Sequence, residues 1–340
     1  MKALAILSRA VMELATIRDV AKRAGVAVST VSRVINQSGY VGGETQRKVL
    51  SAMRELNFQP NRIARGLVSR QTSTIGLLIP DVANPFFSEL SRGVEDAAIA
   101  RGYSVLLCNS DWNPNRENMY INLLNGRWVD GIIVVGSRSD ISVVQQVAAE
   151  TPLVMVDRRS SDFEFAVWTD NRQGAMLAVR HLLEVGCERI VHIAGPMDSP
   201  SAQERRRGYE VAIQEAGMEP MFLEGDFRYA SGFELVNALF QRGDVVDGIF
   251  AGNDLMAIGA LQAAANLGIR VPDNLAVVGY DNIPSTHYVS PPLTTIDQPA
   301  YDMGYSAFEL LYDRLSKDSP TENQQMKFEP KLVLRESTRR

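Results

Sequence analysis

Short apolar runs recur along the chain from Thr74 onward, and segments with helical spacing separate them. The runs are IGLLIP, YSVLLC, GIIVV, LVMV, RIVHIAG, GIFAG and LAVVGYD. Strands that alternate with helices indicate doubly wound parallel sheets, because a parallel pair needs a crossover connection and the crossover helices cover both faces. The stretch from 72 to 340 is too long for one comfortable core, so we predict an α/β body of two doubly wound parallel-sheet subdomains.

The composition excludes several classes of protein. With 45% apolar and 22% charged residues the chain is neither disordered nor fibrous. No apolar run reaches the ~20 residues of a membrane span, so we expect no membrane contact. Two cysteines, Cys108 and Cys187, make no disulfide framework and fit a reducing cytoplasm.

The sequence also lacks the motifs of common catalytic and metal sites. The three histidines have no metal-ligand spacing, and there is no phosphate-cradling loop, nucleophile elbow or acid/base dyad. We therefore predict that the protein is not an enzyme and that it binds no metal or cofactor.

Charge is divided unevenly along the chain. Residues 16–71 contain ten basic and three acidic residues, whereas the whole chain carries a formal charge of −5. A basic head on an acidic body indicates that only the head meets a polyanion such as DNA.

The head has the spacing of a small all-α unit of three helices. A first helix begins with a capping box of Thr16 and Asp19 and ends at Gly25. A second is predicted from Val28 to Asn36, and a third from Glu44 to Leu56. The outer face of the second helix carries short polar side chains and one arginine. These suit an approach to base edges, since Arg can bond guanine in bidentate fashion and Ser or Thr can serve either base.

The segment TIRDVAKRAGVAVSTVSRVIN, followed by ELNFQPNRIARGL, closely resembles the helix-turn-helix headpiece and hinge of the LacI family of transcriptional regulators. The resemblance implies that Val28, Ser29 and Arg33 face the major groove of DNA, with Thr30 beside them. One departure is Ala27, where the family usually has a capping Ser. Loss of such a cap typically costs about 1 kcal/mol, so the recognition helix depends more on packing and DNA contact.

Residues 61–68 resemble the hinge helix of the same family, in which a leucine from each subunit wedges into the minor groove. Leu67 occupies that position in this chain. An apolar wedge unstacks a base step and kinks the duplex, and the adjacent Gly66 weakens an isolated helix by about 1 kcal/mol. We therefore expect the hinge to be ordered only on DNA.

Polar residues follow several of the predicted strands of the body. In open α/β sheets ligands lie beyond the carboxyl ends of the strands, so side chains at these points share one cleft. Acids, amides and an arginine there describe a site for a polyhydroxylated ligand, and aromatic side chains can clamp its apolar faces. The polar residues are Asn84, Asp157, Arg158, Asn253, Asp281 and Gln298, and the aromatic ones are Phe86, Phe87 and Phe227.

The strings NPFF, MVDR, GND, GYD and PPLTTIDQP resemble the periplasmic ribose-binding proteins and their repressor relatives. This resemblance implies sugar contacts for those nine residues and for Arg205, which precedes Gly208 by three residues as in the family. An Asn that contacts sugar after GIIVV is absent, with Gly136 and Ser137 near its place, and Tyr280 replaces a Phe. The resemblance favours ribose or a related pentose as the ligand.

These features predict a periplasmic-binding-protein-like core behind a DNA-binding headpiece. The expected parts are a frayed extension at 1–15, with Met12 as an alternative start, the headpiece at 16–60, a hinge helix and linker at 61–72, and a ligand-sensing core at 73–340. In the core, an N-subdomain covers about 73–172 plus 298–327, and a C-subdomain covers about 173–297 plus 328–340.

The function predicted from these parts is a cytoplasmic repressor that binds a pseudo-palindromic operator as a homodimer and is released by a small sugar. No leucine heptad follows KLVLREST, so we expect a dimer rather than a tetramer. A purine-sensing repressor is the nearest alternative, although purine sensors of the family carry an Arg where Ser199 stands. A periplasmic sugar-binding protein would share the body, but it needs a signal peptide and has no use for residues 16–71.

Overall fold

The computed structural model describes residues 15–36, 38–58, 72–125, 129–158, 163–316 and 324–339. They belong to two compact units, a head that ends at Thr72 and a body that begins at Ser73. Most of the predicted extension and of the hinge, including Leu67, lies outside the described residues.

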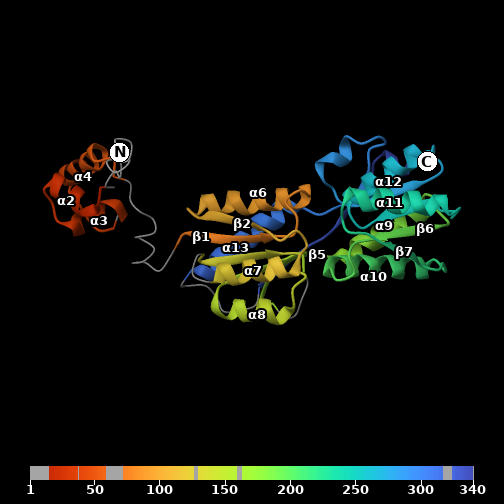
Figure 1. The fold of residues 1–340 in the computed structure, drawn as a ribbon, viewed down its shortest axis with the longest axis horizontal. Helices are drawn as coiled ribbons and strands as arrows, with labels where there is room; N and C mark the ends of the chain where they lie inside the picture. Colours follow the sequence, from red (N-terminus) through yellow and green to blue (C-terminus); the bar gives the residue numbers. More distant parts are fainter. Residues whose placement is uncertain are drawn as a thin grey trace, which may run out of the picture. The chain divides into compact units, whose positions relative to one another are not determined.

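The described part of the head contains the three short helices α2 (Ile17–Ala24), α3 (Val28–Asn36) and α4 (Gly43–Glu55) (Figure 1). The predicted capping box is present, because the Thr16 hydroxyl accepts a hydrogen bond from the amide of Asp19 and the Asp19 carboxylate accepts one from the amide of Thr16. Gly25 ends α2 at a φ of 69°, a left-handed conformation that glycine adopts readily. A small apolar core with side chains from all three helices holds the head together.

The first half of the body is a parallel six-stranded sheet with the strand order β11-β5-β4-β3-β1-β2. Helices α6 and α13 cover one face, and α7 and α8 cover the other (Figure 1). Its elements are β1 (Thr74–Ile79), α6 (Pro85–Ala100), β2 (Ser104–Asn109), α7 (Pro114–Asn125), β3 (Gly131–Val135), α8 (Ile141–Glu150), β4 (Leu153–Val156), β5 (Phe165–Thr169), α13 (Ala300–Leu315) and β11 (Gln324–Phe328).

The second half repeats this architecture with the strand order β12-β10-β9-β8-β6-β7, in which only β12 runs antiparallel to its neighbour. Helices α11 and α12 cover one face, and α9 and α10 cover the other. Its elements are α9 (Asn171–Glu184), β6 (Ile190–Ala194), α10 (Pro200–Glu215), β7 (Met221–Glu224), α11 (Tyr229–Gln241), β8 (Gly248–Ala251), α12 (Asp254–Asn266), β9 (Ala276–Asp281), η1 (Pro284–His287), β10 (Thr294–Asp297), β12 (Lys331–Val333) and η2 (Glu336–Thr338).

The central strands are buried on both faces, which explains their continuous apolar sequences. On β1, Ile75, Leu77 and Ile79 pack into the core under α6 and α13, whereas Leu78 packs into the core under α7 and α8. The seven apolar runs of the sequence correspond to β1, β2, β3, β4, β6, β8 and β9, which confirms the predicted α/β class.

Of the five remaining strands, β10 corresponds to the LTTI segment before Gln298, and the other four did not emerge from the sequence pattern. Three of them, β7, β11 and β12, lie at sheet edges, where one side of the strand has no partner, and their sequences MFLE, QQMKF and KLV form no long apolar run. The fourth, β5, reads FAVWT and is buried between β4 and β11.

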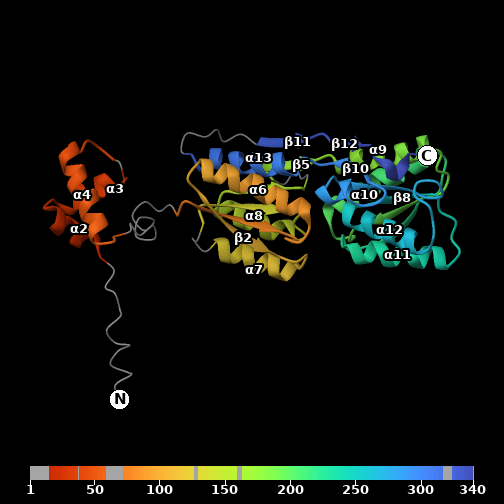
Figure 2. The same cartoon turned by 90° about the horizontal axis from the view of Figure 1, so that it is seen from above.

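The described chain crosses between the two halves of the body three times. The crossings connect β5 to α9, β10 to α13 and β11 to β12, and Figure 2 shows β11 and β12 close together along one side of the body. Short connections of this kind are the elements about which two halves can rotate. Among the described residues, no helix has both the length and the apolar character needed to cross a bilayer.

Helices α6 and α13 pack closely because each carries a glycine at the contact. A Cβ atom on Gly93 would lie 2.1 Å from the carbonyl oxygen of Tyr301, and one on Gly304 would lie 2.0 Å from the carbonyl oxygen of Leu90. Backbone therefore meets backbone at both points. This contact holds α13, which arrives from the second half of the body, against the first sheet.

We expect Gly93→Ala to lower the free energy of unfolding by about 1 to 3 kcal/mol, because the added methyl group must push the two backbones apart. Urea denaturation of the full chain measures this change. Glu95→Ala, on the exposed side of the same helix, is the control and should stay within about 0.5 kcal/mol of wild type. A Gly93→Ala protein as stable as wild type would show that the helices can separate without cost.

Candidate functional site

The exposed face of α3 carries most of the residues predicted to contact DNA. Val28, Ser29 and Arg33 are exposed, and Thr30 is half-buried beside them. The opposite face packs into the core of the head, where Val31 is fully buried. The helix thus presents short side chains and one guanidinium to solvent, which is the arrangement needed to approach base edges.

Backbone hydrogen bonds close the first turn of α3. The carbonyl oxygen of Ala27 accepts hydrogen bonds from the amides of Thr30 and Val31 at 2.9 and 3.2 Å. Exposed basic side chains surround this helix on the rest of the head, namely Arg18, Lys22, Arg23, Arg47, Lys48 and Arg54. They supply the positive field that attracts a phosphate backbone.

In the body, strained backbone marks the carboxyl ends of the strands. Eight non-glycine residues of the described chain have positive φ, and six of them lie at or just after these strand ends. The six are Asp111, Trp112, Asp157, Phe227, Asp281 and Asn282. Each such residue costs about 1 to 3 kcal/mol, and such strain concentrates at binding sites. This edge of the two sheets is therefore the candidate ligand site.

A buried guanidinium joins the polar groups at this edge. Arg205 donates from Nε to Asn171 Oδ1 at 2.7 Å and from Nη1 to the carbonyl oxygen of Gly252 at 2.5 Å. Its Nη1 also lies 3.5 Å from Oδ1 of Asp281. Asn171 in turn donates to Asp157 Oδ1 at 3.3 Å, so residues that follow β4, β5 and β8 meet on one arginine.

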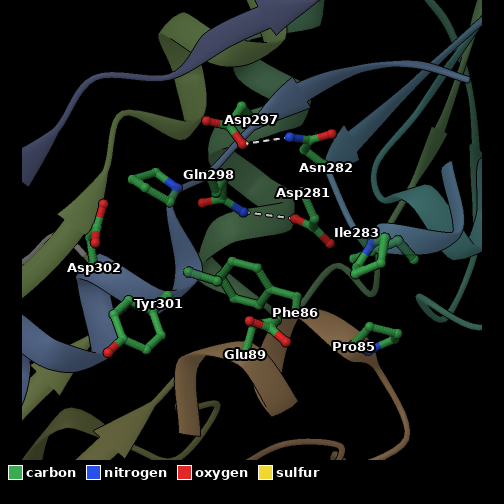
Figure 3. A pocket seen from close by; sticks show the side chains of 13 residues that line it. Pro85, Phe86, Glu89, Asp281, Asn282, Ile283, Asp297, Gln298, Tyr301 and Asp302 are labelled. Atoms are coloured by element: carbon green, nitrogen blue, oxygen red, sulfur yellow. Dashed lines mark hydrogen bonds between the residues drawn. The ribbon is translucent and has the colours of Figure 1, made fainter. Parts of the chain in front are cut away.

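A cavity of about 240 Å³ opens beside this cluster, lined by residues of α6 and α13 from the first half and of β9 and η1 from the second. Figure 3 shows Asp281 and Gln298 pointing toward one another on its wall, where the Gln298 Nε2 donates to Asp281 Oδ1 at 2.7 Å, with Phe86 next to them. The Oε1 of Gln298 is buried and has no hydrogen-bond partner among the described residues. Such an orphaned acceptor costs about 1 to 3 kcal/mol unless a donor reaches it.

Two of the predicted ligand residues also cap helices. Asn84 accepts a hydrogen bond from the amide of Phe86 at the start of α6, and Asn253 accepts one from the amide of Met256 at the start of α12. The Nδ2 of Asn253 donates to the carbonyl oxygen of Phe227 at 2.8 Å. These local bonds fix both amides at the edge where the polar cluster lies.

A row of aromatic rings runs along the same edge. Phe86 lies 5.2 Å from Phe87, Phe87 lies 5.8 Å from Trp112, and Trp112 lies 5.3 Å from Phe227 between ring centroids. Phe86 and Phe87 are largely buried in the first core, whereas Phe227 belongs to the second. Sequence reasoning did not find Trp112, although an aromatic residue shortly after a strand end is the signal that could have found it.

The guanidinium of Arg158 contacts the loop after β3. Its Nη1 donates to the carbonyl oxygens of Ser137 and Ser139 at 3.2 and 3.4 Å, in the loop after β3. Asn171, which the sequence analysis did not single out, connects Asp157 to Arg205 instead. Asn171 could have been found from the sequence if strand β5, which ends two residues earlier, had been recognised.

Tyr280, which departs from the ribose-binding pattern, and Ser199, which departs from the purine-sensing pattern, have clear places in the structure. Tyr280 lies under the Arg205 guanidinium, with the ring centroid 3.8 Å from Cζ, and its hydroxyl approaches Gly174, where a Cβ would lie 2.3 Å away. Ser199 caps α10 by accepting from the amide of Ala202. The residue that stands where purine sensors carry an Arg is thus a buried helix cap.

The acidic groups of the cluster have raised pKa values. Burial raises the pKa of Asp281 to about 7, although the Arg205 guanidinium and the Gln298 amide oppose this rise. Burial also raises the pKa of Asp157, against the attraction of Arg205. Burial and the neighbouring Asp281 together raise the pKa of Asp254. These carboxyl groups favour a ligand that donates hydrogen bonds over an anionic one.

Among the described residues, no group of three or more His, Cys, Asp or Glu side chains has the arrangement of a metal site. The polar edge therefore offers hydrogen-bond donors and acceptors, together with apolar ring faces.

Two family models match the chain. Residues 16–61 match "Bacterial regulatory proteins, lacI family", and residues 72–329 match "Periplasmic binding proteins and sugar binding domain of LacI family". The ribose operon repressor of Halalkalibacterium halodurans is 41% identical over 326 residues, which cover 96% of this chain and 98% of the relative. The HTH-type transcriptional repressor PurR of Photobacterium profundum is 37% identical over 332 residues, with coverage of 96% and 99%. These relatives are repressors rather than enzymes.

A solved structure shares the whole fold. The crystal structure of the lac repressor dimer bound to operator and the anti-inducer ONPF matches with a TM-score of 0.88 and 30% identity, over 96% of this chain and 99% of the other.

The raised pKa of Asp281 predicts a pH-dependent stability. The folded protein keeps this proton up to about pH 7, whereas the unfolded chain loses it near 3.8, so the contribution is fully present below pH 3.8 and is lost as pH rises through 7. Asp281→Asn cannot lose a proton. We therefore expect its melting temperature relative to wild type to be higher at about pH 8 than at about pH 5, measured without ligand.

Asp297→Asn replaces a half-buried carboxylate on the neighbouring strand by the same amide. It is the control for the general effect of an Asp-to-Asn change on the melting temperature. A difference between Asp281→Asn and wild type that stays constant with pH would show that Asp281 is ionised in the folded protein throughout this range.

Proposed function

Because the chain belongs to the LacI family of bacterial regulatory proteins, we propose that it is a cytoplasmic repressor that binds a specific operator and responds to a small sugar. The observation that carries this proposal is the union, in one chain, of a lacI-family headpiece at 16–61 and a sugar-binding-type body at 72–329. Members of the family bind operator DNA as dimers, and this chain spans 99% of the lac repressor chain seen on its operator.

The head is the part that reads DNA in this proposal. Val28, Ser29 and Arg33 contact base edges in the major groove, with Thr30 beside them, and the other exposed basic side chains contact phosphates. A homodimer places two heads on a pseudo-palindromic operator. Leu67, which lies outside the described residues, wedges into the minor groove at the centre of that operator.

The body is the sensor, and we propose ribose or a related pentose as the effector. Asp157, Asp281 and the orphaned Oε1 of Gln298 accept hydrogen bonds from sugar hydroxyls, while Arg205 and Asn253 donate them. A sugar also offers apolar C–H faces to the phenylalanines of the site. The relative with 41% identity is a ribose operon repressor, which supports the same choice.

A purine effector is the second candidate, because a PurR repressor is 37% identical over the same length. The buried Ser199 counts against it, since this small helix cap occupies the place where purine sensors carry an Arg.

Ligand and operator are coupled through the two halves of the body. A ligand held by Asp157 from one half and Asp281 from the other favours one relative position of the halves, and that position favours or disfavours DNA binding. Such coupling is reciprocal and typically amounts to about 1 to 3 kcal/mol. We propose that the sugar releases the operator.

The first test concerns the head. Arg33→Ala should weaken specific operator binding by about 1 to 3 kcal/mol and relax the preference at one base pair per half-site, because a bidentate contact to a base is lost. Lys48→Ala removes an exposed charge that pairs with Glu44 and should at most weaken binding to all sequences alike. Gel-shift titrations against an operator library measure both. An unchanged base preference in Arg33→Ala would exclude Arg33 from base recognition.

The second test concerns the effector. D-ribose should raise the melting temperature and weaken operator binding, and Asp281→Ala should reduce sugar affinity by more than about tenfold, because hydroxyl groups lose a buried acceptor. Operator binding of that variant without sugar should persist. Asp273→Ala removes an exposed carboxylate of the second half that pairs with Arg270, away from the cavity, and as the control it should respond to sugar like wild type. Calorimetry that detects hypoxanthine binding but no pentose binding would replace the sugar by a purine and leave the repressor in place.

A further inference from the structure

Trp112 occupies a fixed position at the rim of the candidate ligand site. It and the preceding Asp111 both have left-handed backbone, with φ values of 55° and 54°. The amide of Trp112 donates to the carbonyl oxygen of Pro80 at 3.1 Å, and its own carbonyl accepts from Arg138 Nη1 at 3.1 Å. Two consecutive strained residues, held by bonds on both sides, aim this indole rather than leave its direction free.

The indole spans the two halves of the body. It packs against the apolar cores of both halves, edge-on to Phe87 from the first and tilted over Phe227 from the second. Phe227 is itself fixed over Gly195, where a Cβ would lie 2.1 Å from the ring. Trp112 therefore lies between Phe87 and Phe227 and contacts both rings.

Two ion pairs flank this ring contact and also link the halves. Asp111 accepts from Arg228 Nη2 at 2.7 Å, so the residues just before Trp112 and just after Phe227 are paired. Arg138, which holds the Trp112 carbonyl, pairs with Asp198 of the second half. Indole and ion pairs thus close the same side of the site together.

The contacts of Trp112 involve the loop after β3, at which the chain departs from the ribose-binding pattern. The loop after β3 lacks the sugar-contacting Asn, and the buried Glu117 carboxylate holds that loop by accepting hydrogen bonds from the Ser137 hydroxyl and from the amides of Arg138 and Ser139. The loop cannot easily move toward a ligand. Its Arg138 instead supports Trp112.

From these contacts we propose that Trp112 determines effector size: its indole closes the site over a single sugar ring and excludes larger sugars. The proposal rests on the sugar-sensing function above and adds the residue that sets the limit. A flat aromatic surface also contacts the C–H face of the enclosed sugar ring, so Trp112 both excludes a second ring and contributes to binding of the first.

Calorimetric titration of the full-length protein with D-ribose and with the disaccharide cellobiose tests this proposal. Wild type and Trp112→Phe should bind no cellobiose, because a ring still closes the rim. Trp112→Ala and Trp112→Leu should gain cellobiose binding, and their affinity for D-ribose should fall by about tenfold with the lost ring contact. Two substitutions, Trp112→Ala and Trp112→Leu, are tested because one of them could unfold the protein. Melting curves and operator binding without sugar show whether each of these opening variants is folded.

Trp168→Ala removes the same side chain from β5, away from the rim, and should leave cellobiose excluded. Cellobiose binding by wild type, or no gain in either folded opening variant, would overturn the role of Trp112. A wild-type protein that binds no D-ribose would contradict the proposed sugar sensor, whereas the cellobiose comparison alone decides the role of Trp112.

Discussion

The body depends on the interactions of the buried Arg205 guanidinium with the polar groups around it. The guanidinium neutralises part of the charge of carboxyl groups that burial would otherwise leave unpaired, and removing one partner from such a buried set typically costs several kcal/mol. Its place is set by a close helix contact, because Gly208 of α10 lets the backbone approach the carbonyl oxygen of Arg172 on α9, where a Cβ would lie 2.2 Å away. Stacking on Tyr280 fixes the plane of the guanidinium. The carboxylates and amides around it can then face a ligand without rearrangement.

Asp157 belongs to the first half of the body and Asp281 to the second, so in the proposed function the same cluster connects ligand binding to the relative position of the halves. Three short crossings are the points about which the halves can rotate, and the glycine contact between α6 and α13 holds α13 against the first sheet. The two parts also differ in charge, since basic residues outnumber acidic ones in the head and acidic residues outnumber basic ones in the body. In the proposed function, the polyanion and the uncharged sugar therefore meet different parts of one chain.

Local physical chemistry made much of this structure predictable. The capping box of Thr16 and Asp19 and the end of α2 at Gly25 depend on neighbouring residues alone, and both appear as expected. Helix α3 has the predicted bounds, because the alternation of buried and exposed side chains sets them. The central strands were visible because burial on both faces demands apolar residues throughout. Edge strands such as β7 do not need apolar residues throughout, and the sequence pattern did not reveal them.

The sequence by itself determined the helices of the head, the α/β class and the set of polar residues at strand ends, since periodicity, capping and strand order are encoded within short stretches. Only the tertiary structure decided which of those residues meet. It joined Asp157 to Arg205 through Asn171, turned Arg158 toward the loop after β3, and brought Trp112 against Phe227. The partners come from strands far apart in the chain, and their contacts depend on how two sheets are packed, which no local pattern records.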